Sequence, residues 1–162
     1  MAYSESKVRK RLTKAASDAL KEIGMLMKKD ILKAFDNEHG YNESGMKVPW
    51  EKLDPEYVNA KPPRGRDGSS HPILNFEGDL RKAIDVRVKG FVLDNDVFST
   101  KMKERGGKGR ISVKDISENL RVKRPHTNPS SKFHEGGDII GSVLSRHFEI
   151  AIKEMVEQGY WN

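Results

Sequence analysis

Five histidines and a few carboxylates are the side chains of this sequence that could perform chemistry. His126 and His134 share one predicted loop with Glu135, just ahead of Asp138, and such residues can ligate a divalent metal. Their spacing matches no zinc or nuclease pattern, and a chain without cysteine lacks the thiolates of most structural zinc sites. We therefore interpret these histidines as polar loop side chains and expect no bound metal.

Other candidates for catalysis are equally weak. Asp94 and Asp96 could act as paired carboxylates, but Asp-Asn-Asp between apolar runs is typical of a turn. Gly106-Gly-Lys-Gly109 lacks the spacing of a phosphate-binding loop. His147 falls on the apolar face of a predicted helix, which favours a core or interface role. We expect no catalytic residues, no cofactor and no enzymatic activity.

Composition places the chain among single-domain proteins with a small core. The sequence has 162 residues, of which 35% are hydrophobic and 33% charged. That length suffices for one buried core, yet the charge content suggests that partner subunits complete the burial. Without cysteine there is no disulfide framework, so a cytoplasmic or virion protein fits better than a small secreted one. No apolar run is long enough for a membrane span or a signal peptide, so we expect a soluble protein without membrane contact.

The positive charge is concentrated in one segment. Residues 101–124 contain nine Lys and Arg against three acidic residues, and this excess equals the net charge of +6 of the whole chain. A local cationic stripe indicates a polyanionic partner, either nucleic acid or an acidic protein face, unless it is merely a solvated loop. We name as the basic arm the following residues of this segment: Lys101, Lys103, Arg105, Lys108, Arg110, Arg121, Lys123 and Arg124.

Apolar periodicity predicts a long helix at each end of the chain. From Ser4 to about Phe35 the apolar residues recur at three- and four-residue intervals, and Gly40 is a plausible C-terminal cap. A helix of roughly 30 residues is about 45 Å long, which exceeds what a compact domain of this size needs, so part of it should contact another chain. Asp138 is expected to cap a second helix that ends near Gln158.

The middle of the chain is predicted to be a mixture of loops and short elements. Asp54-Pro55-Glu56 is expected to start a short helix within the loop, and residues 77–84 are expected to form another. Alternation after Asp85 predicts a β-hairpin with its turn at residues 94–96. The glycine-rich stretch 101–110 is expected to be a flexible tip. Residues 112–120 fit either a short helix or an irregular arm.

Together these elements predict one α+β domain in which the two terminal helices pack on a small antiparallel β-sheet, with long loops. Its expected parts follow in chain order: a long helix (1–39), a loop (40–73), a short helix and β-hairpin (74–98), the basic arm and a loop (99–137), and the C-terminal helix (138–162).

The segment from Val48 to Ile84 contains the most specific pattern of the sequence. Trp50-Glu-Lys-Leu53 leads into a capped turn and a long polar loop, and the apolar cluster Ile73–Ile84 follows. Loops of this length in small domains are usually functional or linkers. Nothing in the segment resembles reaction chemistry, so it is better interpreted as a packing module than as a lid over an active site.

This segment resembles the tail-completion and neck proteins of tailed phages, in the virion morphogenesis group. Their pattern is roughly W-x-x-L-x-x-x-Y, a K/R, then I-L-x-x-x-G-x-L-R-x-S/A-I. We call the matching residues the assembly motif: Trp50, Leu53, Tyr57, Leu74, Gly78, Leu80 and Ile84. The chain departs from the group at Glu77, where a small hydroxyl residue is common, and in the region of Lys123-Arg-Pro-His126.

The resemblance implies a structural virion protein at the head–tail junction. Such a protein would assemble as a ring of six or twelve copies around the DNA channel, between the portal or connector and the tail-terminator proteins. It would reside in the virion, and in the host cytoplasm during assembly. The assembly motif would then face either this subunit's own core or a neighbour, and the basic arm either genomic DNA or an acidic neighbouring ring.

A nonspecific basic nucleic-acid-binding accessory protein is the alternative. Phosphate attraction requires only Lys and Arg. The basic arm, however, contains no aromatic residue for stacking on bases, and no recognition helix is evident.

Charge neutralisation of the basic arm tests its role. Replacing Lys101, Lys103, Arg105, Lys108 and Arg110 with glutamine should impair junction assembly or DNA retention, because the polyanionic partner loses its counter-charges. The measurement is the yield of infectious particles. Wild-type infectivity of this variant would exclude a role for these residues.

Overall fold

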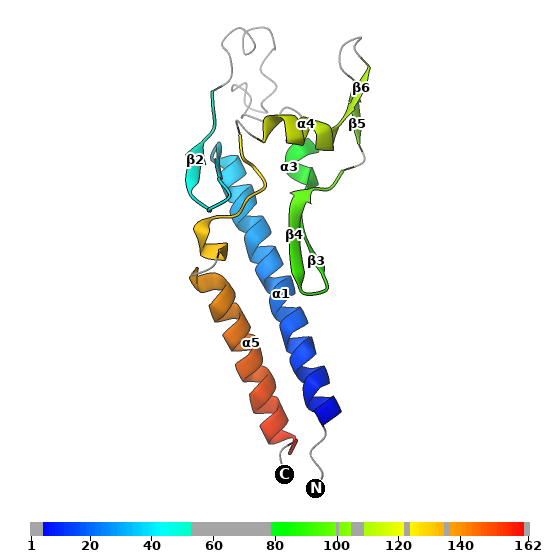
Figure 1. The fold of residues 1–162 in the computed structure, drawn as a ribbon, viewed down its shortest axis with the longest axis vertical. Helices are drawn as coiled ribbons and strands as arrows, with labels where there is room; N and C mark the ends of the chain where they lie inside the picture. Colours follow the sequence, from blue (N-terminus) through cyan, green and yellow to red (C-terminus); the bar gives the residue numbers. More distant parts are fainter. Residues whose placement is uncertain are drawn as a thin grey trace, which may run out of the picture.

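The computed structural model describes residues 5–52, 79–99, 101–104, 109–121, 124–134 and 137–160. Two long helices run antiparallel and place both ends of the chain at the same end of an elongated molecule (Figure 1). Among the described residues, three separate two-stranded antiparallel sheets and two short helices gather toward the opposite end. The predicted α+β class is confirmed, although the single small sheet is three hairpins.

The two long helices follow the predicted periodicity closely. α1 spans Glu5–Asp36 and α5 spans Asp138–Glu157. The predicted caps were wrong, however. Gly137 is the N-cap of α5, and Asp138 lies in the first turn, where its carboxylate faces the positive end of the helix dipole. At the end of α1, Glu38 takes the left-handed conformation (φ 53°) and Gly40 already lies in a strand.

Two hairpins occur where loops were predicted. β1 (His39–Tyr41) pairs with β2 (Lys47–Pro49), and β5 (Met102–Glu104) pairs with β6 (Arg110–Ser112). Each strand has only three residues, which is too short for an alternating pattern to be distinguished from loop sequence. The predicted helix after Asp54 lies outside the described residues.

The central hairpin has its turn four residues earlier than predicted. β3 (Ile84–Lys89) pairs with β4 (Val92–Val97), and the two-residue turn is Gly90-Phe91, with Gly90 at φ 62°. Glycine at the first turn position suits a tight hairpin because it accepts positive φ without strain. Asp94, Asn95 and Asp96, predicted as the turn, lie within β4 instead.

Polar side chains are tolerated in β4 because each finds a partner. Asp94 accepts from Lys89 Nζ at 2.5 Å, Asn95 donates to the Thr127 carbonyl at 2.7 Å, and Asp96 pairs with Arg121 at 2.6 Å. Ile84, expected to end a helix, instead begins β3, because α3 comprises only Asp79–Ala83.

Residues 112–120, which fit either a short helix or an irregular arm, form a helix. α4 spans Val113–Leu120, and Ser112 and Asp115 form a complete capping box that satisfies the first free N–H groups. A 3-10 turn, η1 (Ser131–Phe133), lies in the loop before α5.

The core forms along α1, which packs against α5 and also against the β3–β4 hairpin (Figure 1). Ile23, Ile31, Phe35, Ile84 and Val97 are among its most buried side chains. Gly24 lies where the hairpin crosses α1, and a Cβ there would be 3.4 Å from Leu93 Cδ2, an ordinary contact distance.

Gly40 allows the closest approach between distant segments. A Cβ at Gly40 would lie 1.5 Å from the carbonyl oxygen of Pro125, a backbone atom that cannot swing aside. The strand β1 and the segment around Pro125 can therefore pack together only because residue 40 has no side chain.

The two glycines should respond oppositely to alanine. Gly24→Ala should stabilise the protein by about 0.5–1 kcal/mol, because it removes the cost of a mid-helix glycine and its methyl group fits. Gly40→Ala should destabilise it by about 2–4 kcal/mol through steric overlap. Urea unfolding followed by circular dichroism measures both changes. Equal effects of the two variants would contradict the packing described for Gly40.

Candidate functional site

The described members of the assembly motif lie inside this chain's own core. Trp50, Leu80 and Ile84 retain only 5%, 7% and 1% of their exposure and belong to one core cluster. The Trp50 ring stacks edge-on against Phe35 at 5.0 Å between centroids. These three side chains therefore stabilise the subunit and do not present an outer surface. The other motif residues lie outside the described part of the chain: Leu53, Tyr57, Leu74 and Gly78.

Trp50 also forms the hydrogen bond that joins two distant segments. Its indole Nε1 donates to the Pro125 carbonyl at 2.9 Å, in a buried setting. This is the same carbonyl that approaches Gly40. The tryptophan is thus the anchor that holds the segment after α4 against the end of α1.

A buried histidine next to this anchor was not foreseen as a structural element. His126 is 2% exposed, and its ring lies edge-on to Phe35. Its Nδ1 lies 2.5 Å from the carbonyl oxygen of Arg124, so Nδ1 carries the proton and donates. Nε2 then accepts from the Ser117 hydroxyl at 2.7 Å. His126 therefore links α4 to the loop that follows it, as a neutral imidazole.

The Ser117 hydroxyl and the His126 ring are as close as a catalytic nucleophile and its general base, but their environment is not that of an active site. Ser117 is completely buried, and the second ring nitrogen of His126 bonds a backbone carbonyl where a catalytic triad has a carboxylate. A substrate has no access to the hydroxyl in this arrangement. The contact acts as packing and hydrogen bonding between elements.

Residues capable of metal binding are dispersed. Among the described residues, no group of three or more His, Asp or Glu side chains is placed to hold an ion. His126 has both ring nitrogens engaged, and His147, expected on the apolar face of α5, is half-buried and bonds Glu22 at 2.8 Å. Within the described ranges, no helix combines the length and apolarity needed to cross a membrane.

The basic arm divides into inward- and outward-facing residues. Arg121 pairs with Asp96, and Arg124 is buried with its Nε donating to the Glu51 carbonyl at 3.1 Å. Lys101, just before β5, and Arg110, the first residue of β6, are exposed. The β5–β6 hairpin lies at the end of the molecule opposite to the chain termini (Figure 1). Lys103 is half-buried on β5, and three members lie outside the described residues: Arg105, Lys108 and Lys123.

Ion pairs close one edge of the contact between α1 and α5. Arg11 bonds Glu154, and Glu22 bonds both Arg146 and His147. These bonds lower the pKa of the Glu22 carboxyl, with the hydrogen bond from His147 as the largest cause. All of these residues lie on the same side of the helix pair.

The other edge of this contact includes several apolar side chains. At 3.6 residues per turn, Leu12 and Ala16 lie about 100–140° around α1 from Arg11, and Phe148 and Ile152 lie about 120–160° around α5 from Glu154. Both angles are measured in the direction of increasing rotation along each helix. Because α1 and α5 are antiparallel, these rotations have opposite senses when both helices are viewed from one end. They therefore bring the four residues to the same side of the helix pair. We call this side the open seam edge, with the following members: Leu12, Ala16, Phe148, Ile152 and Val156.

Nearer the sheets, the segment before α5 packs along α1. There the Ser130 amide donates to Asp30 at 2.8 Å, and η1 contacts α5. Nearer the termini the open seam edge remains in solvent, with Ile152 47% and Val156 57% exposed. Ile152 and Val156 are four residues apart on α5, so their exposed side chains adjoin each other.

Comparison with known proteins adds no relative. No protein-family model, no curated protein and no solved structure matches this chain.

Sequence reasoning missed both the His126 link and the open seam edge. A histidine between Pro125 and Thr127 gives no signal of burial, because the partner Ser117 belongs to a segment whose structure was undecided. The Phe148–Ile152–Val156 spacing of four residues was visible, but the sequence does not show which side of α5 meets α1.

Burial of His126 predicts a pH-dependent stability. Burial lowers the pKa of His126 below its usual 6.5. The hydrogen bond to the Arg124 carbonyl raises this pKa, the charge of Arg121 lowers it, and the charge of Asp96 raises it. The unfolded chain therefore binds more protons between the two pKa values, and stability is lost as pH falls from about 6.5 toward the folded-state pKa. The free energy of unfolding, measured in urea from pH 7.5 to 5, should decrease.

His126→Asn provides the control for this dependence. Asparagine cannot titrate, so the variant should be less stable at pH 7.5 but show a shallower decrease toward pH 5. Burial also lowers the pKa of His39, which remains in both proteins and cancels in the comparison. Identical pH slopes would show that His126 does not contribute.

Proposed function

We propose that this chain is a structural virion subunit of the phage neck, which completes the tail and joins it to the head. The proposal combines the resemblance of the assembly motif with one observation, the open seam edge. In this assignment the subunits form a ring around the DNA channel and contact the portal or connector and the tail-terminator proteins. The role is assembly, and no reaction is involved.

The open seam edge supports this proposal because part of the α1–α5 contact has no third described element packed on it. Near the chain termini, α1 and α5 are the only described elements, while the sheets and the loop lie toward the other end (Figure 1). Exposed Ile152 and Val156 would be buried by a neighbouring subunit. Subunit association then supplies the hydrophobic burial that a composition of 35% hydrophobic residues leaves incomplete.

The basic arm has a separate role in this assignment. The β5–β6 hairpin and the open seam edge lie toward opposite ends of the long axis (Figure 1). The edge would join like subunits, and the exposed part of the arm would contact DNA in the channel or an acidic neighbouring ring.

The alternative of a nonspecific nucleic-acid-binding protein is less well supported. Arg121 and Arg124 use their guanidinium groups within the subunit, so they are not available as a free cationic stripe. Such a protein also has no use for an exposed apolar edge on a helix pair, because phosphate binding is electrostatic.

A matched pair of substitutions on α5 tests the assembly role. Ile152 and Ile150 are equally exposed, at 47% and 49%, but only Ile152 lies on the open seam edge. Ile152→Lys should reduce ring formation, or incorporation at the head connector, roughly tenfold or more, because a lysine ammonium would be buried. Ile150→Lys should leave assembly unchanged. Native mass spectrometry of the protein with and without connector-bearing heads measures both.

Two outcomes would contradict the proposal. Equal assembly of the Ile152→Lys and wild-type proteins would exclude the open seam edge as the subunit interface. Salt-dependent binding of the purified protein to random DNA without any assembly would favour the accessory-protein alternative. Portal and tail-tube genes beside the gene for this chain would independently support the neck assignment.

A further inference from the structure

A shallow, open groove of about 460 Å³ lies on α1, at the end where α3 meets it. It is separate from both the core and the basic arm. Its lining comes from the second half of α1 and from one residue of α3, as follows: Met25, Lys28, Lys29, Leu32, Lys33, Asp36 and Arg81.

Ion pairs fix the walls of this groove. Arg81 donates to both carboxylate oxygens of Asp36, from Nε at 2.7 Å and from Nη2 at 2.8 Å. Lys28 donates to Asp85 at 2.9 Å. Asp36 is thereby neutralised, and its pKa is lowered by the hydrogen bonds from Arg81. The carboxylates near the groove are therefore already used by the wall residues.

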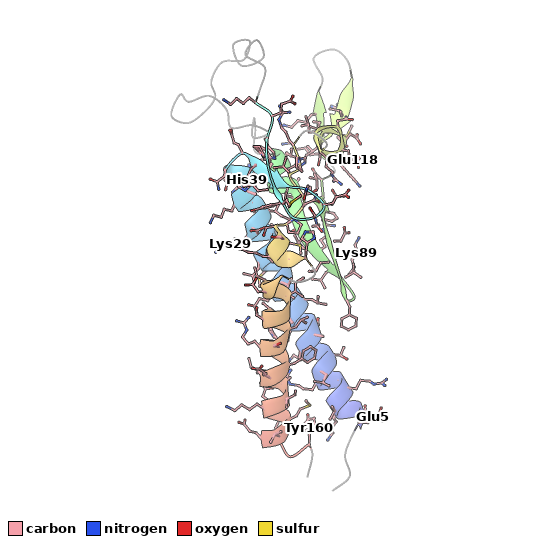
Figure 2. All side chains as sticks on the ribbon, turned by 60° about the vertical axis from the view of Figure 1, so that its left-hand side comes forward. Glu5, Lys29, His39, Lys89, Glu118 and Tyr160 are labelled. Atoms are coloured by element: carbon pink, nitrogen blue, oxygen red, sulfur yellow. The ribbon has the colours of Figure 1, made fainter. Side chains whose placement is uncertain are left out.

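Two lysines on the rim remain uncompensated. Lys29 and Lys33 are exposed and one helical turn apart, and neither forms an ion pair within the described part of the chain. Figure 2 shows Lys29 projecting from α1 on the side away from Lys89 and the β3–β4 hairpin. Two adjacent cations with no internal partner leave the rim with a local positive charge.

The floor of the groove is apolar. Met25 is 67% exposed, among the largest exposed fractions of an apolar side chain in the described residues. Leu32 is half-buried about two turns further along the same face of α1. Methionine adapts its shape to different partners, which suits a protein-binding surface. Phosphates would pair with the lysines but would gain nothing from Met25 and Leu32, and no aromatic residue lines the groove for base stacking.

We propose that this groove docks an acidic, amphipathic segment of a partner protein. Carboxylates one helical turn apart would pair with Lys29 and Lys33, and adjacent apolar side chains would cover Met25 and Leu32. Charge complementarity selects the acidic segment, and the apolar floor selects protein over nucleic acid. The groove lies on a different side of α1 from the open seam edge, so this inference stands independently of the proposed neck assignment.

The test uses the full chain and three fluorescent probes. One is a synthetic helical peptide with Glu pairs four residues apart beside a Leu face, the second is oligoglutamate of equal charge, and the third is a random-sequence DNA duplex. Lys29→Glu/Lys33→Glu should weaken binding of the amphipathic peptide roughly tenfold or more. Lys10→Glu/Lys14→Glu makes the same charge change at the same spacing on α1, outside the groove, and should change affinity less than about twofold.

A further variant distinguishes the contribution of the apolar floor to binding from that of the lysine charges. Met25→Ser should weaken binding of the amphipathic peptide several-fold and leave binding of oligoglutamate unchanged, because only the amphipathic peptide covers the apolar floor. Circular dichroism of each variant verifies that the exposed substitutions leave the fold intact.

Four results of the binding assays would overturn the proposal. They are no measurable peptide binding, equal losses for the two lysine pairs, an unchanged affinity for Met25→Ser, and tighter binding of DNA than of the peptide with the same dependence on Lys29 and Lys33. Self-association that disappears in Lys29→Glu/Lys33→Glu, measured by analytical ultracentrifugation, would assign the groove to a second copy of this chain and so also reject a distinct partner.

Discussion

The contact of Pro125 with Gly40 and Trp50 is the constraint on which the rest of the structure depends. The Pro125 carbonyl accepts from the Trp50 indole at 2.9 Å and occupies the space that a side chain at residue 40 would fill. One backbone atom thus ties the end of α1 to the segment after α4. His126, the next residue, extends the tie to Ser117 of α4 at 2.7 Å. A buried hydrogen bond contributes only about 1 kcal/mol, so its importance lies in fixing position more than in stability.

The position of this tie determines where the apolar surface is covered and where it is not. From Pro125 the chain returns along α1, and the Ser130 amide bonds Asp30 before α5 begins. The returning segment therefore packs along α1 on the side nearer the sheets and ends where α5 starts. Beyond it, Ile152 and Val156 remain exposed, because the chain has no further described element to place there.

The charged and apolar features of the surface occupy several distinct places. Ion pairs close one edge of the α1–α5 contact, the uncompensated lysines lie on the rim of the α1 groove, and the exposed part of the basic arm lies at the far end. A protein with several unlike surfaces suits a place between several neighbours, as the proposed neck role requires. The Trp50 motif, which carries the resemblance, supports these surfaces from within.

The sequence by itself determined the elements whose signal is local and repeated. Three- and four-residue periodicity located α1 and α5 to within one residue, and the capping pair Ser112 and Asp115 was present in the segment that forms α4. It did not locate the turn at Gly90, because Asp94–Asp96 has the composition of a turn and becomes strand only through Lys89, Thr127 and Arg121. Those partners are up to 32 residues away. Only the tertiary structure decided that Trp50, Leu80 and Ile84 face inward, and that Phe148, Ile152 and Val156 lie on an uncovered edge. The physical reason is that burial depends on which segments pack together. In this protein the contact between the Pro125 carbonyl and Gly40 sets which segments do so.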